Sequence, residues 1–214
     1  MKNSKKTILL SIFLVISLSG CYLKSLHPLV EPKDSIEVTG LSGSWMSESQ
    51  RWSFIYSQED FKQHFGEDDF DAEFEDDQPY LVMLEHFEDN ETDTVLFQGS
   101  FVRIGNSDYM DLKPMMADYR GKTIYYESDL YTNHLFPVHT FSKIELNDDD
   151  LRIYIFKSSW INEIIEDNRA RIKHEKTEDG ILLTASTGEL QKFIEKYGAT
   201  KDAYEEPVKL ERKE

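Results

Sequence analysis

The sequence predicts a mainly β fold, an antiparallel barrel or strongly curved meander sheet with two short C-terminal helices. Three observations support this prediction. The chain of 214 residues contains 13 Phe, 11 Tyr and 3 Trp, and aromatic residues suit the half-buried surface of a sheet. The chain contains only 10 Gly and 6 Pro, the residues that interrupt strands. Short segments of alternating apolar residues also follow one another between turn signals, which is typical of all-β sandwiches and barrels.

The strands are predicted from the alternation of apolar side chains. In residues 50–56, Trp52, Phe54 and Tyr56 share one face. The Asp179-Gly180 pair between the last two strands indicates a tight hairpin, because both residues tolerate positive φ. The other predicted strands cover residues 80–88, 94–104, 109–113, 135–146, 151–157, 171–177 and 181–185.

The helices are predicted from apolar residues at helical spacing. One of the two serines at positions 158 and 159 caps the first C-terminal helix, which continues through residue 167. The second begins after Ser186, which forms an S-x-x-E capping box with Glu189. It ends at Gly198. Residues 57–65 are expected to form one further short helix.

Residues 1–20 have the three parts of a secretory signal peptide. A basic start with three lysines precedes an apolar stretch of about eleven residues, which is too short to span a bilayer. Leu18-Ser19-Gly20-Cys21 then places the only cysteine of the chain behind two small residues. This order resembles the lipobox of bacterial lipoproteins. The resemblance implies cleavage before Cys21, lipid attachment to its sulfur and anchoring to a membrane through acyl chains.

The residue that follows Cys21 is Tyr22 rather than Asp. By resemblance to the sorting of Gram-negative lipoproteins, this favours the outer membrane and places the protein in the cell envelope. Residues 21–37 contain two prolines and no hydrophobic period, so a flexible lipidated tether is predicted there. A single β-rich domain is expected over residues 38–200, and a charged, frayed tail over residues 201–214.

The composition excludes some classes of partner. Removal of the signal peptide takes three lysines and no acid, which moves the net charge from −17 to −20. So acidic a surface repels phosphate groups, so no nucleic acid binding is expected. With Cys21 acylated no disulfide can form, and the fold must depend on packing alone. No cofactor is expected.

Two resemblances to known families bear on the fold. Leu41-Ser42-Gly43-Ser44-Trp45 resembles the L-x-G-x-W opening of lipocalin-like and calycin domains, in which the Trp closes one end of an eight-stranded barrel. The resemblance implies a calycin-like barrel with Trp45 in its core. The sequence then departs from that pattern, with no T-D-Y turn and no clear closing Arg. Residues 21–28, 138–144 and 180–186 are similar to a group of small bacterial lipoproteins without an assigned activity.

The acidic run of residues 67–77 invites a calcium-site interpretation, because acids at alternate positions occur in calcium loops. The alternating acids are Asp69, Asp71, Glu73 and Glu75. The sixth position lacks Gly, and Tyr80 stands where a bidentate Glu is required. The run is therefore interpreted as a solvated acidic loop, and whether it binds a cation is left open.

No metal or catalytic site is predicted from the histidines and serines. His134 and His139 are five residues apart, His27 lies in the tether, and His174-Glu175 lacks the second His of H-E-x-x-H. No thiol is left for a structural zinc site. Residues 40–43 also lack the G-x-S-x-G pattern of a hydrolase nucleophile.

The best interpretation is a non-catalytic, lipid-anchored envelope protein that binds a small apolar ligand. Its aromatic side chains could line a cavity, since a barrel of about eight strands can hold one small molecule, or they could fill the interior. The alternative is a structural or assembly adaptor that docks a protein partner through its acidic surface. A third hypothesis is an enzyme of unrecognised type. A hollow barrel favours the first hypothesis, an exposed apolar patch the second, and a buried His or carboxylate cluster at a cleft the third.

Overall fold

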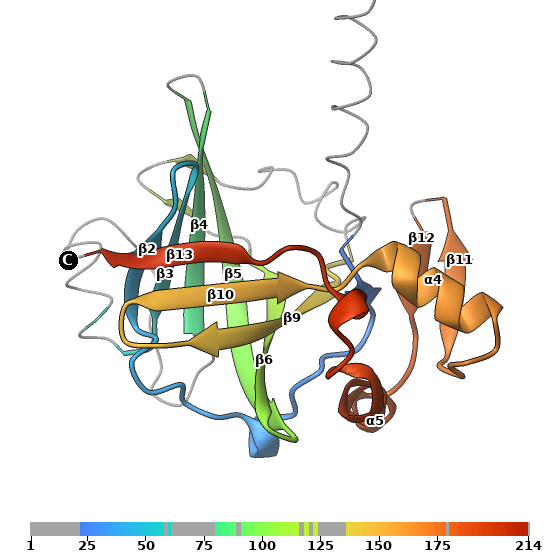
Figure 1. Ribbon diagram of the computed structural model, residues 1–214. Coiled ribbons are helices and arrows are strands. Elements are labelled where there is room, and N and C mark those ends of the chain that lie inside the picture. Colours follow the sequence, from blue (N-terminus) through green and yellow to red (C-terminus); the bar gives the residue numbers. More distant parts are fainter. Residues whose placement is uncertain are drawn as a thin grey trace, which may run out of the picture.

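The computed structural model confirms the predicted fold class. It contains a closed, eight-stranded antiparallel β-barrel of the calycin-like type, with two short helices packed beside it (Figure 1). The residues that the structure describes are 22–57, 60, 80–88, 91–115, 118–119, 122–123, 136–178 and 180–213. The predicted helix over residues 57–65 lies almost wholly outside them.

The barrel strands follow one another around the ring in the order β10-β13-β2-β3-β4-β5-β6-β9. Their bounds are β2 Gly43–Met46, β3 Gln50–Ile55, β4 Tyr80–Glu88, β5 Glu91–Ile104, β6 Ser107–Pro114, β9 His139–Leu146, β10 Asp150–Ile155 and β13 Val208–Lys213. The ring closes because β9 pairs with β6 on one side and with β10 on the other. Residues 80–88 and 139–146 are strands within or equal to their predicted bounds.

The remaining elements are short. They are β1 Lys24–Ser25, η1 Pro32–Asp34, β7 Asp118–Tyr119, β8 Lys122–Thr123, α4 Ser158–Glu166, β11 His174–Thr177, β12 Gly180–Leu183, α5 Thr187–Tyr197 and η2 Lys201–Ala203. β1, β12 and β11 extend the sheet outward from β9 and lie beside α4 and α5 (Figure 1).

The second helix, α5, begins and ends as predicted. Ser186 and Glu189 form the expected capping box, in which the Ser186 backbone N–H donates to the Glu189 carboxylate at 2.9 Å. Gly198 is the C-cap. A Cβ at this position would lie 2.1 Å from the hydroxyl of Tyr109, so the glycine is required by the close approach of the barrel wall.

Alternation along the strands separates two hydrophobic cores. One core fills the barrel interior, and the other lies between the outer wall of the barrel and the two helices. In β5, for example, Phe101 belongs to the inner core and the adjacent Val102 to the outer one. In β6, Met110 belongs to the inner core and Tyr109 to the outer one. Both faces of this part of the barrel are therefore buried.

The tether predicted over residues 21–37 is wrong for the part that the structure describes. β1 pairs antiparallel with β9 and parallel with β12. Leu23, Leu29 and Val30 are 3%, 0% and 7% exposed. This segment has no hydrophobic period because the strand has only two residues, and its partners lie more than a hundred residues away. The chain is packed against the body from Leu23 onward.

The frayed tail predicted over residues 201–214 is also wrong. Val208–Lys213 forms β13, which pairs with β10 and β2 and completes the barrel. Leu210 faces the interior and is fully buried, whereas Lys209 and Glu211 are exposed. A barrel strand needs apolar residues on only one face, so its high charge content did not distinguish it from a solvated tail.

One end of the barrel is closed by a Trp–Arg pair, whose arginine was not clear from the sequence. Trp45 is fully buried, and its indole N–H donates to the Leu41 carbonyl at 2.8 Å. Arg212 pairs with Trp45 in register, and its guanidinium carbon lies 4.2 Å from the ring centroid. The same guanidinium donates to the carbonyls of Ser42 and Gly40. Arg212 therefore ties the last strand to the start of the barrel.

Replacement of Arg212 tests this closure. We expect Arg212→Ala to lower the free energy of unfolding by about 1–3 kcal/mol, because it removes a cation–π contact and the donor to the carbonyls of Gly40, Ser42 and Asp148. Lys209→Ala on the same strand is the matched control, with an expected change within about 0.5 kcal/mol. Urea denaturation measures both. Equal effects of the two substitutions would contradict a closing role for Arg212.

Candidate functional site

In the described part of the chain, the side chains of the barrel interior pack closely against one another. Trp45, Phe54, Phe101, Met110 and Leu151 are each no more than 1% exposed and belong to one core. The Tyr80 and Phe101 rings meet edge to face at 4.8 Å, and the Phe54 and Phe101 rings lie 6.3 Å apart. The aromatic residues therefore pack against one another instead of lining an empty space.

Tyr80 is one of the buried residues of this core. Burial raises the pKa of its phenol to about 12. Its oxygen accepts a hydrogen bond from the Val38 backbone N–H at 3.1 Å. This tyrosine, which stood at the twelfth position of the calcium-loop comparison, is thus a core residue.

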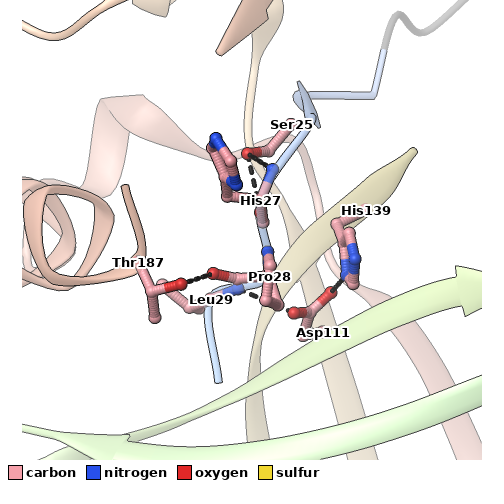
Figure 2. A network of polar contacts seen from close by, with 7 residues as sticks. All are labelled: Ser25, His27, Pro28, Leu29, Asp111, His139 and Thr187. Atoms are coloured by element: carbon pink, nitrogen blue, oxygen red, sulfur yellow. Dashed lines mark hydrogen bonds and ion pairs between the residues drawn. The ribbon is translucent and has the colours of Figure 1, made fainter. Parts of the chain in front are cut away.

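A buried polar network, the N-terminal latch, fastens residues 25–29 to the body (Figure 2). Asp111 of β6 is 3% exposed and accepts the Leu29 backbone N–H at 2.7 Å through one carboxylate oxygen. Its other oxygen lies 2.9 Å from Nδ1 of His139 on β9. From α5, the Thr187 hydroxyl donates to the Pro28 carbonyl at 2.7 Å. The latch thus joins the chain start, the barrel wall and the last helix.

The Asp111–His139 pair resembles part of a catalytic constellation, and its carboxylate also holds the chain start in place. Both carboxylate oxygens of Asp111 are occupied, one by His139 and one by the Leu29 N–H. The nearby Ser25 hydroxyl donates to the His27 carbonyl at 2.8 Å and accepts the His27 N–H at 3.2 Å. Neither Asp111 nor His139 lines the groove between α4 and α5.

A groove of about 850 Å³ lies outside the barrel, between the end of α4, residues 168–174 and α5. Its size is within the range of small-molecule sites, roughly 300–1,000 Å³. The residues that line this α4–α5 groove are Ile165, Asn168, Arg169, Ala170, Arg171, Ile172, Lys173, His174, Glu189, Lys192, Phe193, Lys196 and Tyr197.

The first wall of the α4–α5 groove forms where α4 ends. Asn168 adopts a left-handed conformation with φ of 56°, and the Ala170 N–H returns to the Ile164 carbonyl at 2.8 Å. Along residues 169–173, exposed side chains alternate with buried or half-buried ones. Arg169, Arg171 and Lys173 are exposed, whereas Ala170 is buried. Three cations therefore project from one edge of this segment.

The second wall is α5, where neighbouring stripes of the helix carry different chemistry. Lys192 and Lys196 are four residues apart and exposed. Phe193 and Tyr197 form the adjacent stripe, with ring centroids 5.0 Å apart. The Tyr197 hydroxyl donates to the Arg169 carbonyl, which joins the two walls. Aromatic surface thus lies between two rows of cations.

The electrostatics of the α4–α5 groove oppose those of the whole chain. Five basic side chains and a single carboxylate line it, although the net charge of the chain is −17. That carboxylate, Glu189, is held by the Ser186 backbone N–H, the Ser186 hydroxyl and Lys173, which lower its pKa to about 2. Its negative charge is already satisfied inside the capping box.

The five cations differ in their availability. Arg169 pairs with Glu163 at 2.6 Å, and Lys173 pairs with Glu189 at 3.2 Å. Lys196 lies 4.8 Å over the Tyr197 ring. Arg171 and Lys192 form no ion pair with any residue in the described part of the chain. These two positive charges are available to a ligand.

The residues singled out in the sequence lie in different places. Cys21, the acidic run of residues 67–77 and His134 are outside the described residues. His27 and His139 belong to the N-terminal latch. His174 lines the α4–α5 groove, where its Nδ1 lies 2.8 Å from the Ile172 carbonyl. Trp45 is in the barrel core, as the calycin resemblance implied.

Sequence reasoning missed Arg171 and Lys192. A local signal exists in residues 169–176, R-A-R-I-K-H-E-K, which is the most basic stretch of the folded body in an otherwise acidic chain. The four-residue spacing of Lys192 and Lys196, on the helix that the Ser186 capping box predicts, is a second signal. Nothing in the sequence indicates that these two segments meet.

Comparison of the chain with protein-family models, curated proteins and solved structures gives no match. Neither α4, α5 nor any other helix among the described residues has the length and apolar character needed to cross a membrane. Within that same part of the chain, no group of three or more acidic, histidine or cysteine side chains is arranged to hold a metal ion.

Replacement of Asp111 tests the N-terminal latch. We expect Asp111→Ala to reduce the free energy of unfolding by about 2–4 kcal/mol, because it leaves the buried Leu29 N–H without an acceptor. Asp108→Ala on the same strand removes only an ion pair with the exposed Arg103, so its expected cost is within about 1 kcal/mol.

Hydrogen exchange locates the effect. In Asp111→Ala, the amides of residues 23–30 are expected to lose protection before those of the barrel strands. Uniform loss of protection throughout the protein, or an effect no larger than that of Asp108→Ala, would show that the latch is unimportant.

Proposed function

We propose that the chain is a lipid-anchored, non-catalytic binding protein of the cell envelope, and that its ligand occupies the α4–α5 groove. The observation that carries this proposal is the contrast between the filled barrel interior and the open groove of about 850 Å³ beside it. The eight-stranded barrel is compatible with ligand binding, but its interior residues are already in contact with one another. The groove offers both apolar surface and unpaired charge.

The anchor in this proposal is Cys21, with acyl chains that hold the protein in a membrane, the outer membrane by the Tyr22 criterion. Only Tyr22 separates Cys21 from Leu23, which is 3% exposed. The lipid would therefore attach almost directly to the folded body rather than through a long tether. The position of Asp111 and His139 away from the α4–α5 groove, with both carboxylate oxygens of Asp111 engaged in the N-terminal latch, supports a non-catalytic role for that groove.

Substitution of Cys21 tests the anchor. Cells that express the wild-type chain should incorporate labelled palmitate into it and retain it in the membrane fraction. Cys21→Ser should do neither, because no other thiol exists in the chain. Palmitate incorporation and membrane retention in Cys21→Ser would show that the anchor lies elsewhere.

Native mass spectrometry after incubation with a cell-envelope extract tests the groove. In the Cys21→Ser background, Lys196→Cys introduces a single thiol in the groove, and a bulky maleimide on it blocks the site whatever the charge of the ligand. We expect a small-molecule adduct on the unlabelled variant and none on the labelled one. Lys209→Cys, labelled in the same way on the exposed face of β13, should keep the adduct.

Two results would contradict the groove as the binding site. One is an adduct that survives the groove label. The other is recovery of a protein partner with no small molecule, which would favour the adaptor hypothesis.

A further inference from the structure

We infer that the α4–α5 groove binds an anionic amphiphile, a single hydrocarbon chain that carries a phosphate, carboxylate or similar head group. This inference rests on the proposed function, because it names the class of ligand for the same site. It follows from two kinds of surface that meet in the groove: cations without an ion-pair partner among the described residues, and apolar side chains.

The head group is assigned to Arg171 and Lys192. Both side chains are exposed at the groove, and neither has an ion-pair partner among the described residues. The other three groove cations are partly committed to Glu163, Glu189 and the Tyr197 ring. An arginine and a lysine are suited to one oxyanion, which accepts several charge-assisted hydrogen bonds.

The hydrocarbon chain is assigned to the aromatic and aliphatic floor. Tyr197, Ile165 and Ile172 are half-buried at the groove, and the ring of the buried Phe193 lies 5.0 Å from that of Tyr197. Each methylene that leaves water at such a surface improves affinity about fourfold. A fully polar anion would gain nothing from these residues.

The charge of the whole chain argues against a free inorganic anion as the ligand. At −17, the protein repels anions at long range, and two exposed cations compensate only locally. Apolar contact is therefore needed to hold an anion in the groove. A cationic amphiphile is excluded because its head group would be repelled by the basic side chains that line the groove.

The position of the groove relative to the chain start points to a membrane-derived ligand. Ser25 of β1 and His174 of β11 both pair with Leu183, which places them about 10 Å apart across three strands. Cys21 precedes Ser25 by only four residues, about 14 Å at full extension. A lipidated Cys21 would thus keep the groove close to a source of single-chain amphiphiles.

Isothermal titration of the Cys21→Ser protein tests the inference, with probes kept below their critical micelle concentrations. We expect dodecyl phosphate and dodecanoate to bind at least about tenfold more tightly than dodecanol and dodecyltrimethylammonium. Inorganic phosphate should give no measurable heat. Octyl phosphate should bind more weakly than dodecyl phosphate, because it buries less hydrocarbon.

Charge reversal identifies the residues. Arg171→Glu/Lys192→Glu should weaken dodecyl phosphate binding at least about tenfold, since both head-group contacts become repulsive. Lys209→Glu/Lys213→Glu makes the same change in net charge on exposed positions of β13 and should alter affinity by less than about threefold. Equal weakening by both pairs would overturn the assignment to Arg171 and Lys192.

Other outcomes overturn the inference in distinguishable ways. Binding of dodecanol as tight as that of dodecyl phosphate would show that no anionic head group is required. Binding of inorganic phosphate but of no amphiphile would show that no hydrocarbon chain is required. Sedimentation with phosphatidylcholine–phosphatidylglycerol vesicles without binding of the monomeric probes would indicate a membrane-docking surface instead. Binding of an acidic peptide by a protein that binds no amphiphile would indicate a protein partner.

If dodecyl phosphate binds unchanged to maleimide-labelled Lys196→Cys, the groove itself is not the site, and the proposed function fails as well. If the extract adduct is lost on labelling but no amphiphile binds, only the ligand class is wrong.

Discussion

Closure of the barrel depends on β9, because this strand has more partners than any other in the sheet. Along one side it pairs with β6, and along the other its C-terminal part pairs with β10. Where β10 ends its pairing, at Ser142, the first two residues of β9 are free to accept β1. One strand therefore both seals the ring and starts the outer extension β1-β12-β11. A closed ring has no exposed edge, and the outer sheet is built on the one strand that the ring leaves partly uncovered.

The position of the groove follows from this arrangement. β5, β6 and β9 carry apolar residues on the outside of the barrel, including Val102, Tyr109 and Phe141, which must be covered. The cover comes from α4, α5 and the N-terminal segment, and the N-terminal latch fixes that segment between them. The helices contact the barrel wall with their apolar faces, and residues 168–174 line the groove together with the end of α4 and with α5. The groove is the space left between covering elements, and it lies outside the barrel because the interior is occupied.

The sequence predicts those parts of the fold whose signal is local. Alternation identifies β3 to β6, β9 and β10, and helical spacing with the Ser186 capping box identifies α5. β1 and β13 were missed for different reasons. β1 has two residues, too few for any period, and β13 has a charged outer face that hides one buried Leu210. The Trp45–Arg212 pair and the α4–α5 groove each require residues far apart in sequence to meet, and no spacing rule contains that information.

The distribution of charge links the fold to its proposed role. The chain carries 41 acidic and 24 basic residues, yet five of the basic ones line a single groove with one already satisfied carboxylate. Folding stability does not require this gathering, because exposed cations at Arg171 and Lys192 contribute little without partners. The gathering of these charges also carries little desolvation penalty, because both side chains are exposed. The excess of acidic residues in the chain makes the contrast with the basic groove sharper. In the proposed function, the packed barrel therefore supports a ligand site on the outside of its wall instead of enclosing one.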